Sequence, residues 1–107
     1  MYRVTTPYHT FTLPIQTSDC KVIQVTYEQN NTQLVKQYED ETLPSGMTLD
    51  GKNVIIRLTQ DETKAFAEAA GVLAQVRVLT NANDAYASQK FEVDVDGVLN
   101  EEILTDD

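Results

Sequence analysis

The sequence contains no tryptophan, one cysteine and one histidine among its 107 residues. A single cysteine, Cys20, excludes an internal disulfide and any metal cluster built from several thiolates, and it fits a reducing compartment. A catalytic triad would have to use His9, the sole histidine, which lies beside an expected edge strand. We therefore expect a non-enzymatic protein without a cofactor.

Basic side chains are also scarce, with 8 Lys and Arg against 17 Asp and Glu, so the formal net charge is −9. This charge repels phosphate backbones and anionic lipid, and neither nucleic acid nor a membrane is an expected partner. Solubility accounts for most of the charge, and a docking face for a basic patch is the functional alternative. No apolar run approaches a membrane span or a signal-peptide core, so we expect a soluble protein made in a cytoplasm.

No Gly-rich or Ser-rich stretch separates two cores, so the sequence predicts one domain over residues 9–104. Residues 1–8 are expected to form an N-terminal arm, and residues 105–107 a frayed tail.

Apolar and polar residues alternate in three stretches between Asn53 and Val95, which predicts a β-sandwich. The inward sets are Val54, Ile56 and Leu58; Val72, Ala74, Val76 and Val78; and Phe91, Val93 and Val95. Upstream, Phe11, Leu13 and Ile15 predict an edge strand, because Pro14 cannot donate to a ladder. Ile23, Val25 and Tyr27 predict a further strand, which Asn30-Asn31 joins to a strand around residues 34–38.

One helix is predicted where Thr59-Gln60-Asp61-Glu62 matches a capping box. Its inner stripe comprises Ala65, Phe66, Ala69 and Ala70, and Gly71 ends it. A helix this short must dock Phe66 onto the end of the core.

The last hairpin has a testable register. If residues 81–84 form the loop, Thr80 opposes Ala85, Ala74 faces Phe91 inward, and Leu79 faces Tyr86 outward. Gln89 then lies inside opposite Val76, so either a bulge shifts it or it satisfies buried backbone groups. Residues 98–104 either add a last strand or leave for a neighbouring chain.

Too much apolar area faces outward for a solvated sheet. The candidate partner-binding residues are Leu73, Leu79, Tyr86, Ile55 and Val22. Scattered single exposures, or cover from the arm or the helix, are the alternative.

Signals for chemistry are weak. Asp94 and Asp96 share one strand face before Gly97, but the spacing does not match a calcium loop, and a solvated strand end explains it better. Asp19 disfavours the Cys20 thiolate, so Cys20 is expected to be an unreactive turn residue. An acid-base site at residues 39–41 lacks a second group fixed nearby. No metal ligand set is predicted.

Four stretches together resemble a known family: Thr48 to Val54, Leu58 to Thr63 with Phe66, Ala74 to Leu79, and Ala87 to Val93 with Leu99 to Ile103. They are similar to the immunoglobulin-like N-terminal domain of baseplate upper proteins and related tail proteins of phages of Gram-positive bacteria. The resemblance covers roughly residues 9–104 and implies an immunoglobulin-like antiparallel sandwich of about seven strands.

The resemblance also implies a virion structural part that docks to other tail or baseplate proteins, with a possible homo-oligomer. Because the sequence ends at Asp107 without a following stalk, we expect a role in assembly rather than in receptor binding. A carbohydrate-binding or host-adhesion module is the alternative, for which Tyr8, Tyr38 and Tyr86 are the available aromatic groups.

Overall fold

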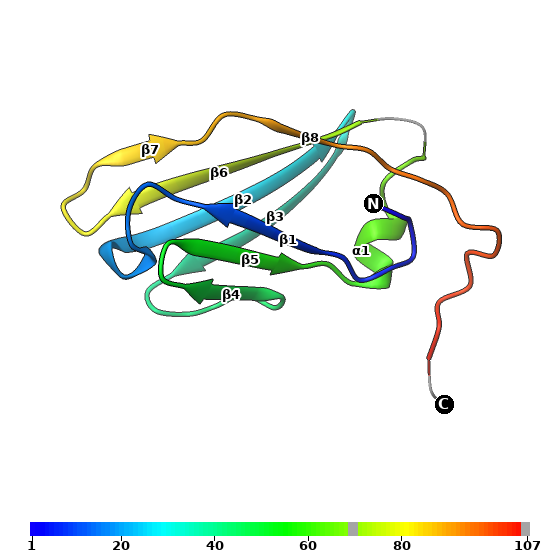
Figure 1. Ribbon diagram of the computed structural model, residues 1–107, viewed down its shortest axis with the longest axis horizontal. Helices are drawn as coiled ribbons and strands as arrows, with labels where there is room; N and C mark the ends of the chain where they lie inside the picture. The colour runs from blue at the N-terminus through cyan, green and yellow to red at the C-terminus, as the bar shows by residue number, and fades with distance from the viewer. Residues whose placement is uncertain (69–70, 106–107) are drawn as a thin grey trace.

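Two antiparallel sheets face each other across a hydrophobic core in the computed structural model, which describes residues 1–68 and 71–105 (Figure 1). The smaller sheet has the order β1-β5-β4, with β1 at Tyr8–Thr12, β4 at Met47–Asp50 and β5 at Asn53–Arg57. The larger sheet contains β2 (Cys20–Gln29), β3 (Thr32–Glu39), β6 (Val72–Thr80), β7 (Ala85–Ala87) and β8 (Phe91–Val93). A short 3-10 turn, η1 (Thr17–Asp19), precedes β2.

The predicted all-β sandwich is confirmed. In the larger sheet the order is β3-β2-β6, followed by β7 and β8, which both pair with β6. This order corresponds to strands C′-C-F-G of an immunoglobulin-type sandwich, and β1-β5-β4 corresponds to B-E-D. No described segment takes the position of strand A beside β1, so β1 is an edge strand, as predicted, although it ends at Thr12 and leaves Leu13, Pro14 and Ile15 outside the strand.

The core consists of the predicted inward sides of the alternating strands. Ile23, Val25 and Tyr27 of β2 are fully buried, and so are Val54 and Ile56 of β5. Strand geometry causes this pattern, because successive side chains point to opposite faces and one face of each sheet is covered by the other. The β2-β3 hairpin and the Asp50-Gly51 turn are also present.

The capping box is present at the start of α1 (Gln60–Lys64), where the Thr59 hydroxyl accepts from the Glu62 N–H and the Glu62 carboxylate accepts from the Thr59 N–H. Phe66 is 1% exposed and belongs to the core, as predicted. The helix is shorter than the predicted inner stripe, because it ends before Ala65, which is exposed. The predicted positions 69 and 70 lie outside the described residues.

The predicted register of the last hairpin is correct at one end and wrong at the other. Val72 opposes Val93 and Ala74 opposes Phe91, as expected. Nearer the turn, Leu79 opposes Ala85 rather than Tyr86. The pairing shifts by one residue between β7 and β8, where the Ser88 N–H donates to Val76 O at 2.8 Å. An extra residue in one strand produces this shift, and it confirms the bulge alternative for Gln89, which is exposed.

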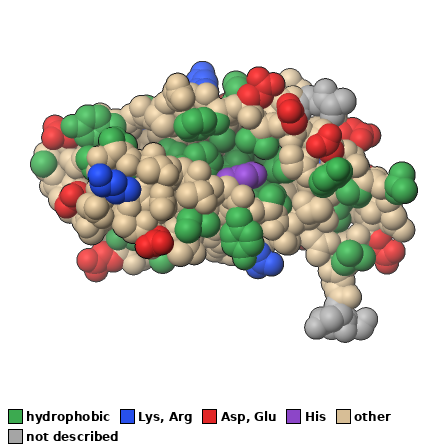
Figure 2. Space-filling model, viewed as in Figure 1, with side chains coloured by type: hydrophobic (Ala, Val, Ile, Leu, Met, Phe, Trp, Pro, Cys, Tyr) green, Lys and Arg blue, Asp and Glu red, His purple; other side chains and the backbone are tan. Residues whose placement is uncertain are grey.

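Phe91 is 39% exposed, although the alternation predicts it inside. The reason is the unequal width of the sheets: β7 and β8 share a fourth strand position, whereas the facing sheet has three. Phe91 therefore covers one side of its ring with Phe11 of β1, at 5.9 Å between centroids, and leaves the other side open. Figure 2 shows apolar side chains gathered around the histidine in this hollowed region, which we call the open seam.

Both termini lie at the helix end of the sandwich (Figure 1). The arm pairs with the segment after β8, since the Arg3 N–H donates to Asp96 O and the Asp96 N–H donates to Met1 O. The tail forms no strand within its described part, so that alternative is wrong; it is tied to α1 by two hydrogen bonds between Gln60 and the Leu104 backbone. No helix in the described ranges is long and apolar enough to span a membrane.

Candidate functional site

The outer face of the five-stranded sheet forms a shallow trough along β2, β3 and β6. Because β2 turns Ile23, Val25 and Tyr27 into the core, Val22, Gln24 and the other alternate residues point outward. Two hollows of about 430 and 380 Å³ share Gln24 and Arg77 in their linings, so they form one continuous depression. We call this surface the outer trough.

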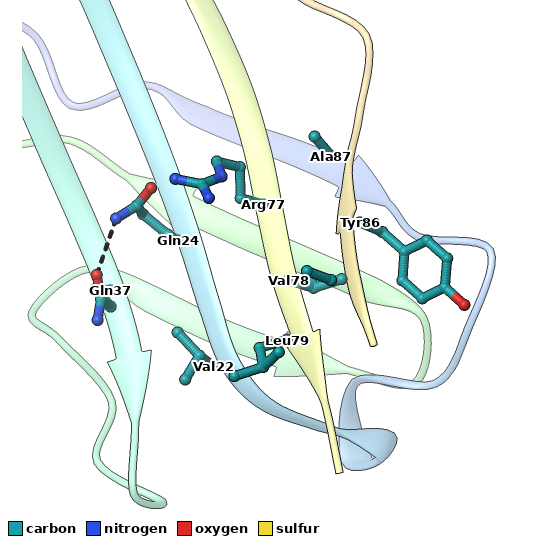
Figure 3. Close-up of a pocket in the computed structure, with 9 residues that line it drawn as sticks. Val22, Gln24, Gln37, Arg77, Val78, Leu79, Tyr86 and Ala87 are labelled. Carbon is teal, nitrogen blue, oxygen red and sulfur yellow. Dashed lines mark hydrogen bonds between the residues drawn. The ribbon is translucent and has the colours of Figure 1, made fainter. Parts of the chain in front are cut away.

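One end of the outer trough is apolar. Val22 of β2 opposes Leu79 of β6, and Leu79 in turn opposes Ala85 of β7. Figure 3 shows the Val22 and Leu79 side chains next to each other between the two strands. Both side chains remain partly accessible, so three neighbouring strands contribute aliphatic surface at this end.

The middle of the outer trough is polar. The Gln24 amide donates to Gln37 Oε1 at 3.0 Å, and Arg77 opposes Gln24 on the next strand (Figure 3). These groups offer both donors and acceptors without a dominant charge. At the far end, Leu73 and Val35 are more than 40% exposed. The rest of that hollow is polar or charged and includes Glu28, Gln33 and Lys90, so the end at Val22 and Leu79 is the apolar one. An apolar patch beside amides and a guanidinium suits contact with another chain.

Four of the five predicted partner-binding residues line the two hollows of the outer trough. Val22, Leu79 and Tyr86 line one hollow, and Leu73 lines the other. Tyr86 opposes Val78, an inward residue, and its ring points past the sheet edge, away from Leu79 (Figure 3). Ile55 lies on β5 in the opposite sheet. The turn before β7 is one residue tighter than predicted, since the Thr80 N–H donates to Asp84 O, and this sets Tyr86 opposite Val78.

The tyrosines that would serve a glycan-binding platform lie on three separate surfaces. Tyr8 is on the outside of β1, where the Arg57 guanidinium lies 5.8 Å from its ring centroid. Tyr38 packs partly against the core, and Tyr86 lies at the sheet edge. No two of these three rings form a described ring contact.

His9 faces inward from the edge strand rather than outward. Its Nδ1 lies 2.8 Å from the Tyr27 hydroxyl, and burial, with the N-terminal ammonium as a second cause, lowers the pKa of His9. Burial and then Glu62 raise the pKa of Tyr27 far above its ordinary value, so this phenol stays protonated. The pair is a half-buried hydrogen bond within the fold.

An ion pair between Lys36 and Glu62 was not predicted by the sequence reasoning. Lys36 Nζ lies 2.6 Å from the Glu62 carboxylate and donates to Ser45 O at 2.9 Å. Burial raises the pKa of Glu62, but hydrogen bonds from Lys36 and Thr59 outweigh burial and lower the pKa overall. The pair connects β3 to the residue that caps α1, so its role is structural. The signal for it was a lysine at an inward position of β3.

The other titratable candidates do not assemble into a site. Cys20 is buried at the start of β2, rather than in a turn, and burial together with Asp19 raises the pKa of its thiol. Asp94 and Asp96 are exposed, and the described residues contain no group of three or more possible metal-ligating side chains. No protein-family model, curated protein or solved structure matches this sequence.

Proposed function

We propose that this domain is a non-catalytic protein-docking module that binds its partner through the apolar end of the outer trough. The observation that carries the proposal is the cross-strand pair of Val22 and Leu79, two accessible aliphatic side chains on the solvent face of a sheet. A sheet whose other face is already buried gains nothing from apolar residues outside unless something covers them.

The partner is a structural protein of a phage tail or baseplate, as the family resemblance implies, and the domain is part of the virion. With a net charge of −9, the domain attracts basic protein surfaces and repels nucleic acid. Arg77 and the amides of Gln24 and Gln37 border the apolar pair, and this arrangement matches the polar rim and Arg enrichment of protein interfaces.

The experiment is co-expression of the domain with each protein encoded by the neighbouring genes, followed by co-purification. Val22→Thr with Leu79→Thr removes apolar surface and places threonine, a residue that favours strands, at both positions. Ile55→Thr, a partly exposed aliphatic residue on the opposite sheet, is the matched control. We expect one structural partner to co-purify with the wild type and the control and to be lost from the double variant.

The proposal is wrong if no neighbouring gene product binds while cell-wall polysaccharide does. That outcome would favour a host-adhesion module, with the amides of the trough binding sugar hydroxyls. Retention of the partner by the double variant would place the interface elsewhere on the domain. Thermal unfolding of all variants confirms that loss of binding does not reflect loss of fold.

A further inference from the structure

One edge of the smaller sheet is open along the whole length of β1. The Leu13 N–H donates to Lys52 O at 2.7 Å, and the Leu58 N–H donates to Pro7 O at 3.1 Å, so the odd-numbered residues of this strand direct their peptide groups to β5. The alternate residues Tyr8, Thr10 and Thr12 therefore direct their N–H and C=O groups to the open side. No described strand pairs with this side.

The open edge lacks the features that usually block strand addition. Over its five residues β1 carries no charged side chain, no proline and no bulge; Pro7 immediately precedes it, and Pro14 follows two residues after its end. Five residues of strand extend about 17 Å. An exposed edge of this length is able to pair with another strand.

The open seam next to this edge is apolar and has room for side chains. Between β1 and β7 lies a hollow of about 390 Å³, lined among others by Leu13, Ile15, Val78 and Tyr86, and no charged side chain lines it. Tyr86 and Phe91, at 57% and 39% exposed, face the space in front of β7 and β8. Backbone groups and an apolar floor thus meet at the same place, which is the arrangement that an added strand uses.

We infer that the open seam is a docking site for one extended segment of a partner protein, which pairs antiparallel with β1 as an additional strand. Its inward residues are alternating aliphatic or aromatic side chains without charge, because the lining offers no counter-charge. Its flanks are basic, since the domain carries a net charge of −9. Antiparallel pairing matches every strand pair of the sheet.

A second copy of the domain does not fit this site edge to edge. Since the larger sheet is one strand position wider than the smaller one, β7 and β8 project beyond β1 (Figure 1). Pairing β1 with the β1 of a second copy would bring the two projecting strands into the same space. The site is one strand wide, and a single segment fills it.

The tail of a neighbouring copy does not fit either. Along residues 98–104, one strand face carries Glu101 and the other carries Glu102, so either register buries a carboxylate in an uncharged seam. In addition, Glu101 pairs with Arg3 and the Leu104 backbone bonds to Gln60 of the same chain. A segment from a different protein is the remaining occupant.

The test is binding of a short synthetic peptide of alternating valine and threonine between lysine pairs, followed by amide chemical shifts of the isotope-labelled domain. The matched control peptide is N-methylated on the residues that face β1. Thr10→Pro removes an open-side N–H that β5 does not use, and Thr10→Val keeps it. Tyr86→Glu places a charge at the mouth of the open seam, on a side chain that the fold leaves 57% exposed.

We expect shift changes at Tyr8, Thr10 and Thr12 and around Phe91, with affinity kept by Thr10→Val. N-methylation, Thr10→Pro and Tyr86→Glu should each weaken binding by roughly tenfold, the effect of losing one or two hydrogen bonds or of burying a charge. The inference is overturned if the peptide does not bind, if N-methylation has no effect, or if the shift changes lie on the outer trough. A dimer of the domain alone that uses β1 would overturn it as well.

Discussion

Glu62→Gln should destabilise the domain by about 3 kcal/mol, because it leaves the Lys36 ammonium without its counter-charge. The side chains of Lys36 and Glu62 are only 9% and 19% exposed. Removing one partner of a buried ion pair costs about 3 to 5 kcal/mol, and the residual exposure of Glu62 sets the expected loss at the lower end. A glutamine still serves the capping box, so loss of the helix cap does not contribute.

Urea unfolding monitored by circular dichroism measures this loss directly. A change of about 3 kcal/mol lowers the melting temperature of a domain of this size by roughly 10 to 25 °C. Lys36→Met keeps the buried stem and removes the charge, and the double variant restores a neutral interior. We expect the double variant to be less destabilised than the sum of the two single variants, by about 1 kcal/mol or more.

Glu102→Gln, at an exposed position of the tail, is the matched control and should change stability by less than about 0.5 kcal/mol. If Glu62→Gln behaves like this control, or if the effects of Lys36→Met and Glu62→Gln simply add, the two charges are not coupled. The connection between β3 and the cap of α1 would then have to come from apolar contacts alone.

Three further predictions follow from single side chains. Phe66→Ala should lower the free energy of unfolding in urea by about 3 to 5 kcal/mol. A loss as small as that of an exposed residue would show that the core does not need this ring. Gly46→Ala should cost at least about 2 kcal/mol, because φ is +85° and a Cβ would lie 2.3 Å from Arg57 O; an unchanged melting temperature would contradict the backbone conformation. The pKa of His9 is lowered from 6.5 in the folded protein, so the unfolded chain binds this proton at a higher pH. The free energy of unfolding should therefore fall as the pH drops below 6.5. His9→Gln should remove this fall from a plot of the urea midpoint against pH, and an unchanged plot would refute the prediction.

Much of the fold was predictable because alternation is a local property. The inward residues of each strand follow from the order of residues along that strand alone. This holds for the sets between Asn53 and Val78 and for Ile23, Val25 and Tyr27 before them. The capping box is equally local, since the Thr59 side chain bonds to a backbone group three residues away. Such features need no knowledge of what packs where.

The functional surfaces were predicted only in part. Val22 and Leu79 were recognised as outward residues, but their direct pairing across β2 and β6 required the sheet order. Tyr86 opposes Val78 rather than Leu79, because the turn before it is one residue shorter than predicted, with the Thr80 N–H donating to Asp84 O. Ile55 points outward as well, but from the opposite sheet, and strand alternation does not say which sheet a strand joins.

By itself, the sequence determined the β-sandwich class, the inward side of most strands and the start of the helix, because each depends on spacing within a few residues. Only the tertiary structure decided the sheet order, the unequal widths of the two sheets and the Lys36–Glu62 ion pair, because these join residues distant in the chain. The open seam beside β1 belongs to this second group. It exists because one sheet has a strand position that the other does not cover.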